Sequence, residues 1–185
     1  MAIKVQFIDT EFLKENTLIE QNVDDAKLNP LIFKAQEIHI ETILGSDFYN
    51  HLMDAAYNDT LTQDEKDLIA NYIQQCVAEW VAYMSVNQLT NKFTNKAIVQ
   101  EFSQYSATSD RLERTDLKND LRNDAEVYSK RLITHLCQYS ELYPLYYNPN
   151  TNENVRRNST SFFNNIYIPR NTSCGCDSSS QYRND

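Results

Sequence analysis

Residues 62–89 read TQDEKDLIANYIQQCVAEWVAYMSVNQL, the longest stretch of the chain with periodic apolar residues. These residues recur at steps of three and four, which places them along one face of an α-helix. They are Leu68, Ile69, Tyr72, Ile73, Cys76, Val77, Trp80, Val81, Tyr83, Met84 and Leu89. Thr62 and Glu65 fit a capping box at its start. At about 1.5 Å per residue this helix is about 40 Å long, so several other helices must cover its apolar face.

Glycine usage supports a helical class for the whole chain. Only two of the 185 residues are glycines, Gly45 and Gly175, fewer than the turns of an all-β or α/β protein require. The length allows one domain and an appendage. The sequence therefore predicts an all-α bundle of about five helices, two of them long, with a protruding loop or hairpin arm and an extended C-terminal tail. The bundle comprises residues 1–148 and the tail residues 149–185.

The remaining helices are predicted from caps and apolar spacing. They are a short helix from Asp9 or Thr10 to Asn16, a helix from Asp24 to Gly45, one capped by Ser46 that ends at Tyr57, and a second long helix from Ser109 or Asp110 to Tyr139. Pro30 lies inside the second of these, so that helix either kinks there or begins its regular part at Pro30. Gly45 is expected to end it as a left-handed C-cap.

The connection between the two long helices, residues 91–109, loses the apolar period. It is much longer than the roughly 2–8 residues that join neighbouring helices in a bundle. We expect a protruding hairpin-like arm that binds a partner. Its candidate contact residues are Phe93, Ile98, Val99 and Phe102.

The C-terminal part changes composition twice. Residues 142–149 are aromatic and contain Pro144 and Pro149, so we expect an extended piece that packs back on the bundle. Residues 150–185 are rich in Asn, Ser and Arg, a composition that does not bury enough apolar surface to order itself. One apolar island interrupts them. Its residues, Phe162, Phe163, Ile166, Tyr167 and Ile168, have the form of a docking motif for a partner, although a loose end or a strap on the same domain is the alternative.

The charge is unevenly distributed. Residues 1–148 hold 13 Lys and Arg against 23 Asp and Glu, whereas residues 149–185 hold four Arg against three acids. The excess of acids in residues 1–148 argues against DNA binding of the kind in which Lys and Arg neutralise phosphates, but DNA can slide past a surface that repels it. The charged flank of the second long helix fits either a solvated face with weak ion pairs or a contact with a neighbouring subunit.

No pattern of catalytic, cofactor-binding or metal-binding residues emerges. The chain has no phosphate-binding glycine loop and no nucleophile elbow, and none of its three histidines has the Glu-x-x-His spacing of a di-iron bundle. Asp47 and His51 fit a surface hydrogen bond better than a shared metal. Cys76 and Cys137 fit buried hydrophobes, and Cys174 and Cys176 a thiol pair in the tail. We expect no enzyme activity, no cofactor, no metal and no membrane span, with a cytosolic location at least at synthesis.

Three stretches together resemble a known family. They are Val23-Asp24-Asp25 leading to Ile43-Leu44-Gly45 and Phe48-Tyr49, then Phe93-Thr94-Asn95-Lys96, and finally Ala125 to Leu132 followed by Tyr143-Pro144. In this order and spacing they are similar to the head–tail connector (head-completion adaptor) proteins of tailed phages, particularly those of crAss-like and other Bacteroidetes phages. The likeness covers about residues 5–148.

The resemblance implies a virion protein of the portal and neck region. It implies a homo-oligomeric ring, commonly of twelve copies, that contacts the portal protein on one side and the next tail or ring protein on the other. DNA would pass through the lumen without specific binding, and no catalysis is implied. Two other classes remain open, which are a small helical interaction or regulatory module that does not form rings, and an enzyme with an unrecognised site.

Overall fold

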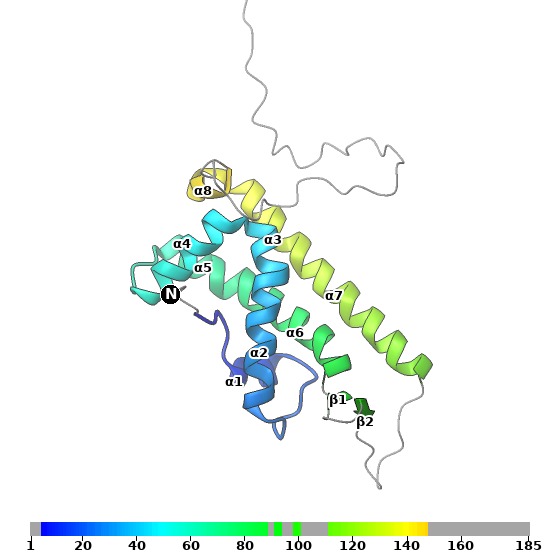
Figure 1. Ribbon diagram of the computed structural model, residues 1–185. Coiled ribbons are helices and arrows are strands. Elements are labelled where there is room, and N and C mark those ends of the chain that lie inside the picture. The colour runs from blue at the N-terminus through cyan, green and yellow to red at the C-terminus, as the bar shows by residue number, and fades with distance from the viewer. Residues whose placement is uncertain (1–4, 89–90, 94–97, 101–110, 148–185) are drawn as a thin grey trace, which may run out of the picture.

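The computed structural model describes residues 5–88, 91–93, 98–100 and 111–147 (Figure 1). The elements are α1 (Thr10–Asn16), α2 (Asp25–Ala35), the π-helical segment η1 (Gln36–Ile40), α3 (Glu41–Leu44), α4 (Ser46–Tyr57), α5 (Gln63–Leu68), the π-helical segment η2 (Ile69–Ile73), α6 (Gln74–Gln88), β1 (Asn91–Phe93), β2 (Ile98–Gln100), α7 (Arg111–Gln138), the 3₁₀ turn η3 (Ser140–Leu142) and α8 (Pro144–Tyr147). The predicted all-α bundle is confirmed.

The predicted long helix of residues 62–89 is the centre of the bundle. It comprises α5, η2 and α6, and α6 packs against both α2 and α7. In Figure 1, α2 with α3 and α7 both run upward, whereas α6 between them runs downward. The side chains of this long helix that belong to the core include Leu68, Ile73, Cys76, Val77 and Val81, and these five are fully buried. The apolar face read from the sequence is thus covered on two sides by neighbouring helices.

The helix starts follow the predicted caps. Asp9 and Asp24 accept backbone hydrogen bonds at the starts of α1 and α2. Thr62 and Glu65 form the complete capping box of α5. Because α2 begins at Asp25 and continues through Pro30, the alternative in which its regular part begins at Pro30 is wrong.

Two π-helical segments interrupt the long helices, and the sequence did not predict either of them. Each inserts a wider turn with i→i+5 hydrogen bonds, which rotates the side chains that follow. Segment η1 carries Gln36 and His39, and segment η2 carries Tyr72. As described below, these side chains make contacts between elements that lie far apart in the sequence.

At the joint between α3 and α4, the structure differs from the predicted caps at Gly45 and Ser46. Gly45 adopts φ 81° and ψ 153°, so the positive φ that favours glycine is present, but ψ lies outside the left-handed helical region. Gly45, and not Ser46, occupies the N-cap position of α4. Ser46 is the first residue of that helix, it is buried, and its Oγ donates to Glu41 Oε1 at 2.7 Å. Ser46 therefore ties α4 back to α3.

The end of the bundle also differs from expectation. The aromatic residues after α7 pack back on the bundle as predicted, with Tyr143 and Tyr146 buried, but they do so in η3 and α8 rather than in an extended piece. On α7, Leu121, Ala125, Leu132 and Leu136 are buried, whereas Leu117 and Tyr139, at the same helical spacing towards its two ends, are exposed. Cys137 is only partly buried.

The segment before α1 is held by side-chain amides. Gln36, fully buried, accepts a hydrogen bond from the backbone N–H of Phe7 (2.9 Å) and donates to the carbonyl of Val5 (3.1 Å). Gln74 donates to the carbonyl of Phe7 at 2.8 Å. Because Phe7 and Ile8 are buried in the core, this short extended segment is an integral part of the bundle.

Candidate functional site

The predicted partner-binding arms are described only in part. β1 and β2 pair antiparallel, with Phe93 opposite Ile98 and Lys92 opposite Val99, so the start of the connection between the long helices has the backbone of a hairpin. Phe102 lies outside the described residues. So do the tail residues Phe162, Phe163, Ile166, Tyr167 and Ile168, together with Cys174 and Cys176. Their proposed roles in binding stay predictions.

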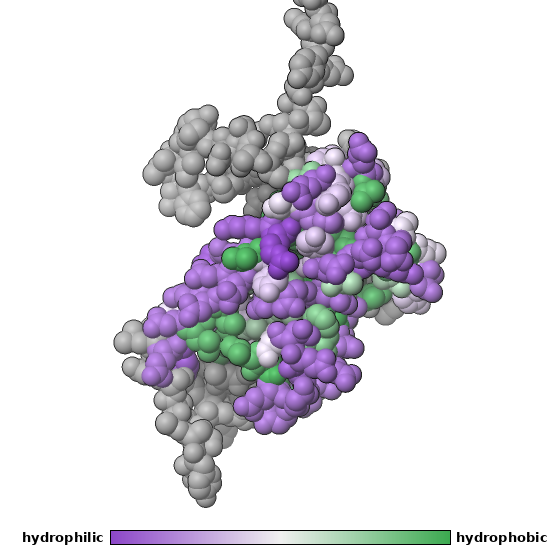
Figure 2. Space-filling view, turned by 180° about the vertical axis from the view of Figure 1, so that it is seen from behind, coloured by the Kyte–Doolittle hydropathy of each residue, from purple (hydrophilic) through white to green (hydrophobic). Residues whose placement is uncertain are grey.

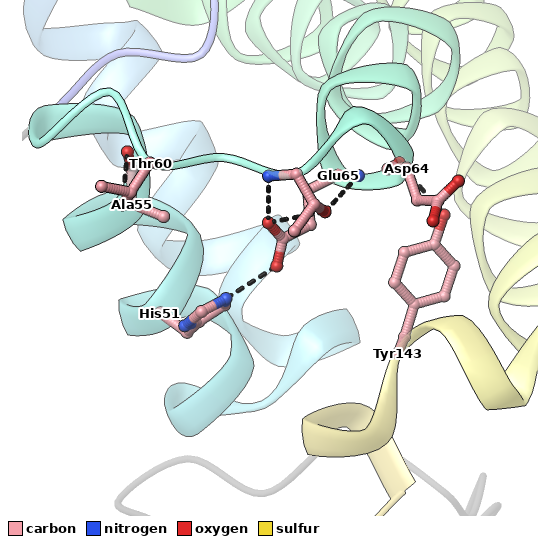
Figure 3. Close-up of polar contacts among 7 residues, drawn as sticks. His51, Ala55, Thr60, Asp64, Glu65 and Tyr143 are labelled. Atoms are coloured by element: carbon pink, nitrogen blue, oxygen red, sulfur yellow. Dashed lines mark hydrogen bonds and ion pairs between the residues drawn. The ribbon is translucent and has the colours of Figure 1, made fainter.

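A buried carboxylate joins α4 to α5 (Figure 3). Glu65 Oε2 accepts hydrogen bonds from the backbone N–H and the hydroxyl of Thr62, at 2.8 and 3.0 Å. His51 Nε2, on α4, lies 2.7 Å from Glu65 Oε1. Burial alone would raise the pKa of Glu65, but these hydrogen bonds outweigh burial and hold the pKa below its usual value. The stabilisation is therefore present above about pH 4.5 and is lost as the pH falls through the lowered pKa.

A second set of contacts joins α5 to α7 and α8. Tyr143 Oη donates to the carbonyl of Asp64 at 3.3 Å, and burial raises the pKa of Tyr143 to about 12 (Figure 3). His135 Nε2 lies 3.3 Å from the same hydroxyl, and the His135 ring stacks on Tyr72 of η2 at a centroid distance of 4.0 Å. The first turn of α5 is thus the point where four helices meet.

Replacing Glu65 by alanine tests this junction. We expect Glu65→Ala to lower the free energy of unfolding by about 1–3 kcal/mol, because it removes the acceptor of the cap and leaves the Thr62 N–H without its partner. Asp67→Ala is the matched control, an exposed acid on the same helix, and should change stability by at most about 0.5 kcal/mol. Urea denaturation followed by circular dichroism measures both. Equal effects would contradict the assignment.

The only tryptophan links η1, α6 and α7. The ring of Trp80 stacks on His39 of η1 with a centroid distance of 3.6 Å and an interplanar angle of 5°, and its Nε1–H donates to Ser129 Oγ of α7 at 2.9 Å. Ser129 Oγ in turn donates to the carbonyl of Ala125 and lies 3.5 Å from Cys76 Sγ. Burial lowers the pKa of His39 to about 4 and raises that of the Cys76 thiol to about 11. Both groups are therefore uncharged at neutral pH.

The lowered pKa of His39 makes the stability depend on pH. The unfolded chain takes up a proton at His39 near pH 6.5, whereas the folded chain resists it until about pH 4, so stability is lost as the pH falls from 6.5 towards 4. Allowing for the partial exposure of His39, we expect a loss of about 1 kcal/mol between pH 7 and pH 5. The variant His39→Gln should lack this loss of stability between pH 7 and pH 5. Denaturation followed by Trp80 fluorescence at both pH values measures the difference, and identical pH dependence in the two proteins would refute it.

Two solvent-facing stripes lie on the helices that flank α6. The first, on α7, contains the exposed residues Asp116, Asp120, Asn123, Val127, Lys130 and Thr134. The second, on α2, η1 and α3, contains Lys27, Pro30, Lys34 and Ile38, all exposed, and the half-buried Glu41. We name them the α7 face and the α2–α3 face. Viewed from behind, the body is mostly hydrophilic, with apolar side chains in small groups (Figure 2).

The sequence predicts the charged flank of α7 but not the α2–α3 face. Its apolar spacing places Ile38 on one stripe with the buried Leu31 and Ala35, and this is wrong, because Ile38 is 45% exposed. Lys27, Lys34 and Glu41 recur with Ile38 at helical spacing and lie on the same side. On α7, Arg122 and Glu126 form an exposed ion pair one turn apart, at 2.9 Å, as expected of a solvated flank. The residues of the α7 face take no part in that pair.

Within the described residues, no group of three or more His, Cys, Asp or Glu side chains is arranged to hold a metal ion. None of the helices in the described part of the chain combines the length and apolar character needed to cross a bilayer. The arrangements that stand out are therefore the helix junctions and the two solvent-facing stripes.

Comparison with known proteins gives one match. A family of unknown function, DUF6712, matches residues 40–156, which is the part from the end of η1 through α7 and α8 and into the segment that follows. No curated protein and no solved structure matches the chain significantly.

Proposed function

The chain belongs to the DUF6712 family, and we propose that it is a structural virion protein of tailed phages. In this proposal identical copies form a ring below the portal, which joins the capsid to the tail and extends the DNA channel. The protein works in the neck of the virion, has no catalytic role, and contacts the portal protein on one side and a tail or ring protein on the other.

The observation that carries the proposal is that the β1–β2 pair and α8 lie at opposite ends of α7. Helix α7, 28 residues long, runs along the body. The β1–β2 pair lies at its first end, whereas α8, after which residues 148–185 follow, lies at its other end (Figure 1). A protein that sits between two rings must reach partners at both ends. Here the β1–β2 pair lies at one end of α7, and the described chain ends with α8 at the other.

The charge distribution supports a DNA channel without a DNA-binding site. Residues 46–68, which form α4, α5 and the turn between them, contain six acids and a single Lys. A surface of this charge repels phosphates, so DNA can move past it without being held.

The residues that carry the resemblance to connector proteins have structural roles that fit a shared architecture. Gly45 supplies the positive φ of the α3–α4 joint, and Leu44 and Phe48 beside it are buried. Ala125 and Leu132 pack α7 into the core, and Tyr143 fixes α8 to α5. Because these positions determine how the helices join, a likeness at all of them favours a common fold.

Co-assembly with the portal protein encoded by the same phage genome tests the proposal. We expect negative-stain images of the co-expressed proteins to show rings on portals. A variant that ends after Tyr147 should keep its helical circular dichroism spectrum but attach to its neighbouring ring more weakly. A chain that stays monomeric and does not bind the portal would instead favour a helical interaction module. Loss of the fold in the shortened variant would contradict the role of the tail as a docking segment.

A further inference from the structure

The two solvent-facing stripes defined above have complementary charge patterns. In chain order, the α7 face presents acids, then Val127, then Lys130, whereas the α2–α3 face presents lysines, then Ile38, then Glu41. Val127 is 52% exposed and Ile38 is 45% exposed, which is high for large apolar residues in the middle of long helices. Each face thus consists of an exposed apolar residue with opposite charges on its two sides.

The spacing matches as well as the sign. Asp116 lies eleven residues before Val127, and Lys27 lies eleven residues before Ile38. Lys130 follows Val127 by three residues, and Glu41 follows Ile38 by three. If the two helices lie side by side and parallel with Val127 against Ile38, acid meets lysine at both ends of the contact. An antiparallel arrangement would instead bring Asp116 towards Glu41 and Lys130 towards Lys27.

The fold favours the parallel sense over the antiparallel one. In Figure 1, α2 and α7 both run upward, α2 close to vertical and α7 on a diagonal, and both pack against α6. Neighbours in a ring are related by a rotation about the ring axis, which preserves directions along that axis. When that axis runs upward in this view, α7 of one subunit and α2 of the next therefore point the same way along it.

The charged groups of both faces are available for such a contact. In the described part of the chain the ion pairs involve Lys14, His51 and Arg122 with their partners, and none involves Asp116, Asp120, Lys27, Lys34 or Lys130. Glu41 accepts a hydrogen bond from Ser46 through Oε1, which leaves its Oε2 for a lysine. Exposed ion pairs add little affinity, but they fix register and disfavour wrong alignments.

From these observations we infer that the α7 face of one copy binds the α2–α3 face of the next copy, head to tail and parallel, with Val127 against Ile38. This interface rests on the proposed ring function and specifies the surfaces and the polarity of the contact. It is heterologous, so it continues from copy to copy until a ring closes.

Charge reversal tests the pairing. Asp116→Lys with Asp120→Lys places lysines against lysines, and Lys27→Glu with Lys34→Glu places acids against acids. We expect each double variant to self-associate about tenfold more weakly than the unmodified chain, because like charges then face each other across the contact. A chain with all four changes, or an equimolar mixture of the two double variants, should regain assembly. Asp54→Lys with Asp67→Lys, on α4 and α5, is the matched control and should assemble normally.

Cysteine cross-linking tests the contact independently of ring closure. In a chain with Cys137, Cys174 and Cys176 changed to serine, Val127→Cys and Ile38→Cys together should give a ladder of disulfide-linked oligomers on a non-reducing gel. With either substitution alone, the chain should run as a monomer on that gel. A dimer from Val127→Cys alone would overturn the inference in favour of a symmetric α7–α7 contact, and absence of the ladder would overturn it as well.

The two proposals fail in different ways. If the unmodified chain forms rings, but charge reversal and cross-linking behave as in the control, the function stands and this interface is wrong. If the two-cysteine chain gives a ladder but no ring forms with or without the portal, the interface stands and the connector function is wrong. Analytical ultracentrifugation of each variant, with and without portal protein, separates these results.

Discussion

Replacing Phe48 by alanine is expected to lower the free energy of unfolding by about 3–5 kcal/mol, the range for a large aromatic side chain removed from a closed core. Phe48 is 2% exposed. Its ring centroid lies 5.8 Å from that of Tyr143 and 6.4 Å from that of Tyr146, so it holds α4 against the segment that ends in α8. Denaturant unfolding followed by far-ultraviolet circular dichroism measures the loss.

The matched control for Phe48 is Leu18→Ala. Leu18 is 75% exposed and its truncation should cost less than about 0.5 kcal/mol. A loss below about 1 kcal/mol for Phe48→Ala would mean that the contacts between α4 and α8 do not form as described. The attachment point of residues 148–185 would then be wrong as well.

The second large effect is expected at Gln36, where leucine should lower the free energy of unfolding by about 2–3 kcal/mol. The change keeps the site filled but leaves the backbone N–H of Phe7 and the carbonyl of Val5 without the partners that Gln36 provides. Native-state hydrogen exchange gives the more specific readout, because the amide proton of Phe7 should lose its protection.

Gln63→Leu serves as the control for this substitution. Gln63 is exposed and bonds only across one helical turn, to Asp67 Oδ1 at 2.9 Å, among the contacts shown for it. Its replacement should leave both stability and the protection of the Phe7 amide nearly unchanged. Retained protection at Phe7 in Gln36→Leu would show that another group satisfies this amide.

Much of the bundle follows from local signals in the sequence. The capping box of Thr62 and Glu65, the cap at Asp24 and the positive φ of Gly45 are all consequences of side-chain chemistry within a few residues. The helix at the end of the bundle also has a local signal, although the prediction of an extended piece was wrong. Pro144 is the first residue of α8, a position that proline favours because its missing N–H costs nothing there.

The π-helical segments are different, because their cause is tertiary. η1 places His39 on Trp80 and Gln36 on the segment before α1, and η2 places Tyr72 on His135. Each of these contacts joins residues that lie about 30–60 positions apart, and no local pattern predicts them. The pairing of His51 with Glu65, rather than with a group on its own helix, has the same origin.

Only one of the two faces of the candidate interface, the α7 face, could be predicted from the sequence. The charge run of α7 suggested a subunit contact, but its partner surface became apparent only from the fold, in which α2 and α7 both pack against α6 and both run upward in Figure 1. Residues assigned to the arms, such as Phe102 and Phe162, lie outside the described part of the chain, so their roles remain predictions from composition and spacing.

The central claim is that identical copies of this chain assemble into a closed ring. The most direct measurement is negative-stain electron microscopy, with class averages of the chain co-expressed with its portal protein. We expect rings with one rotational symmetry, seated on the portal and open at the centre. Single, unsymmetrical particles of one-chain size beside bare portals would contradict it.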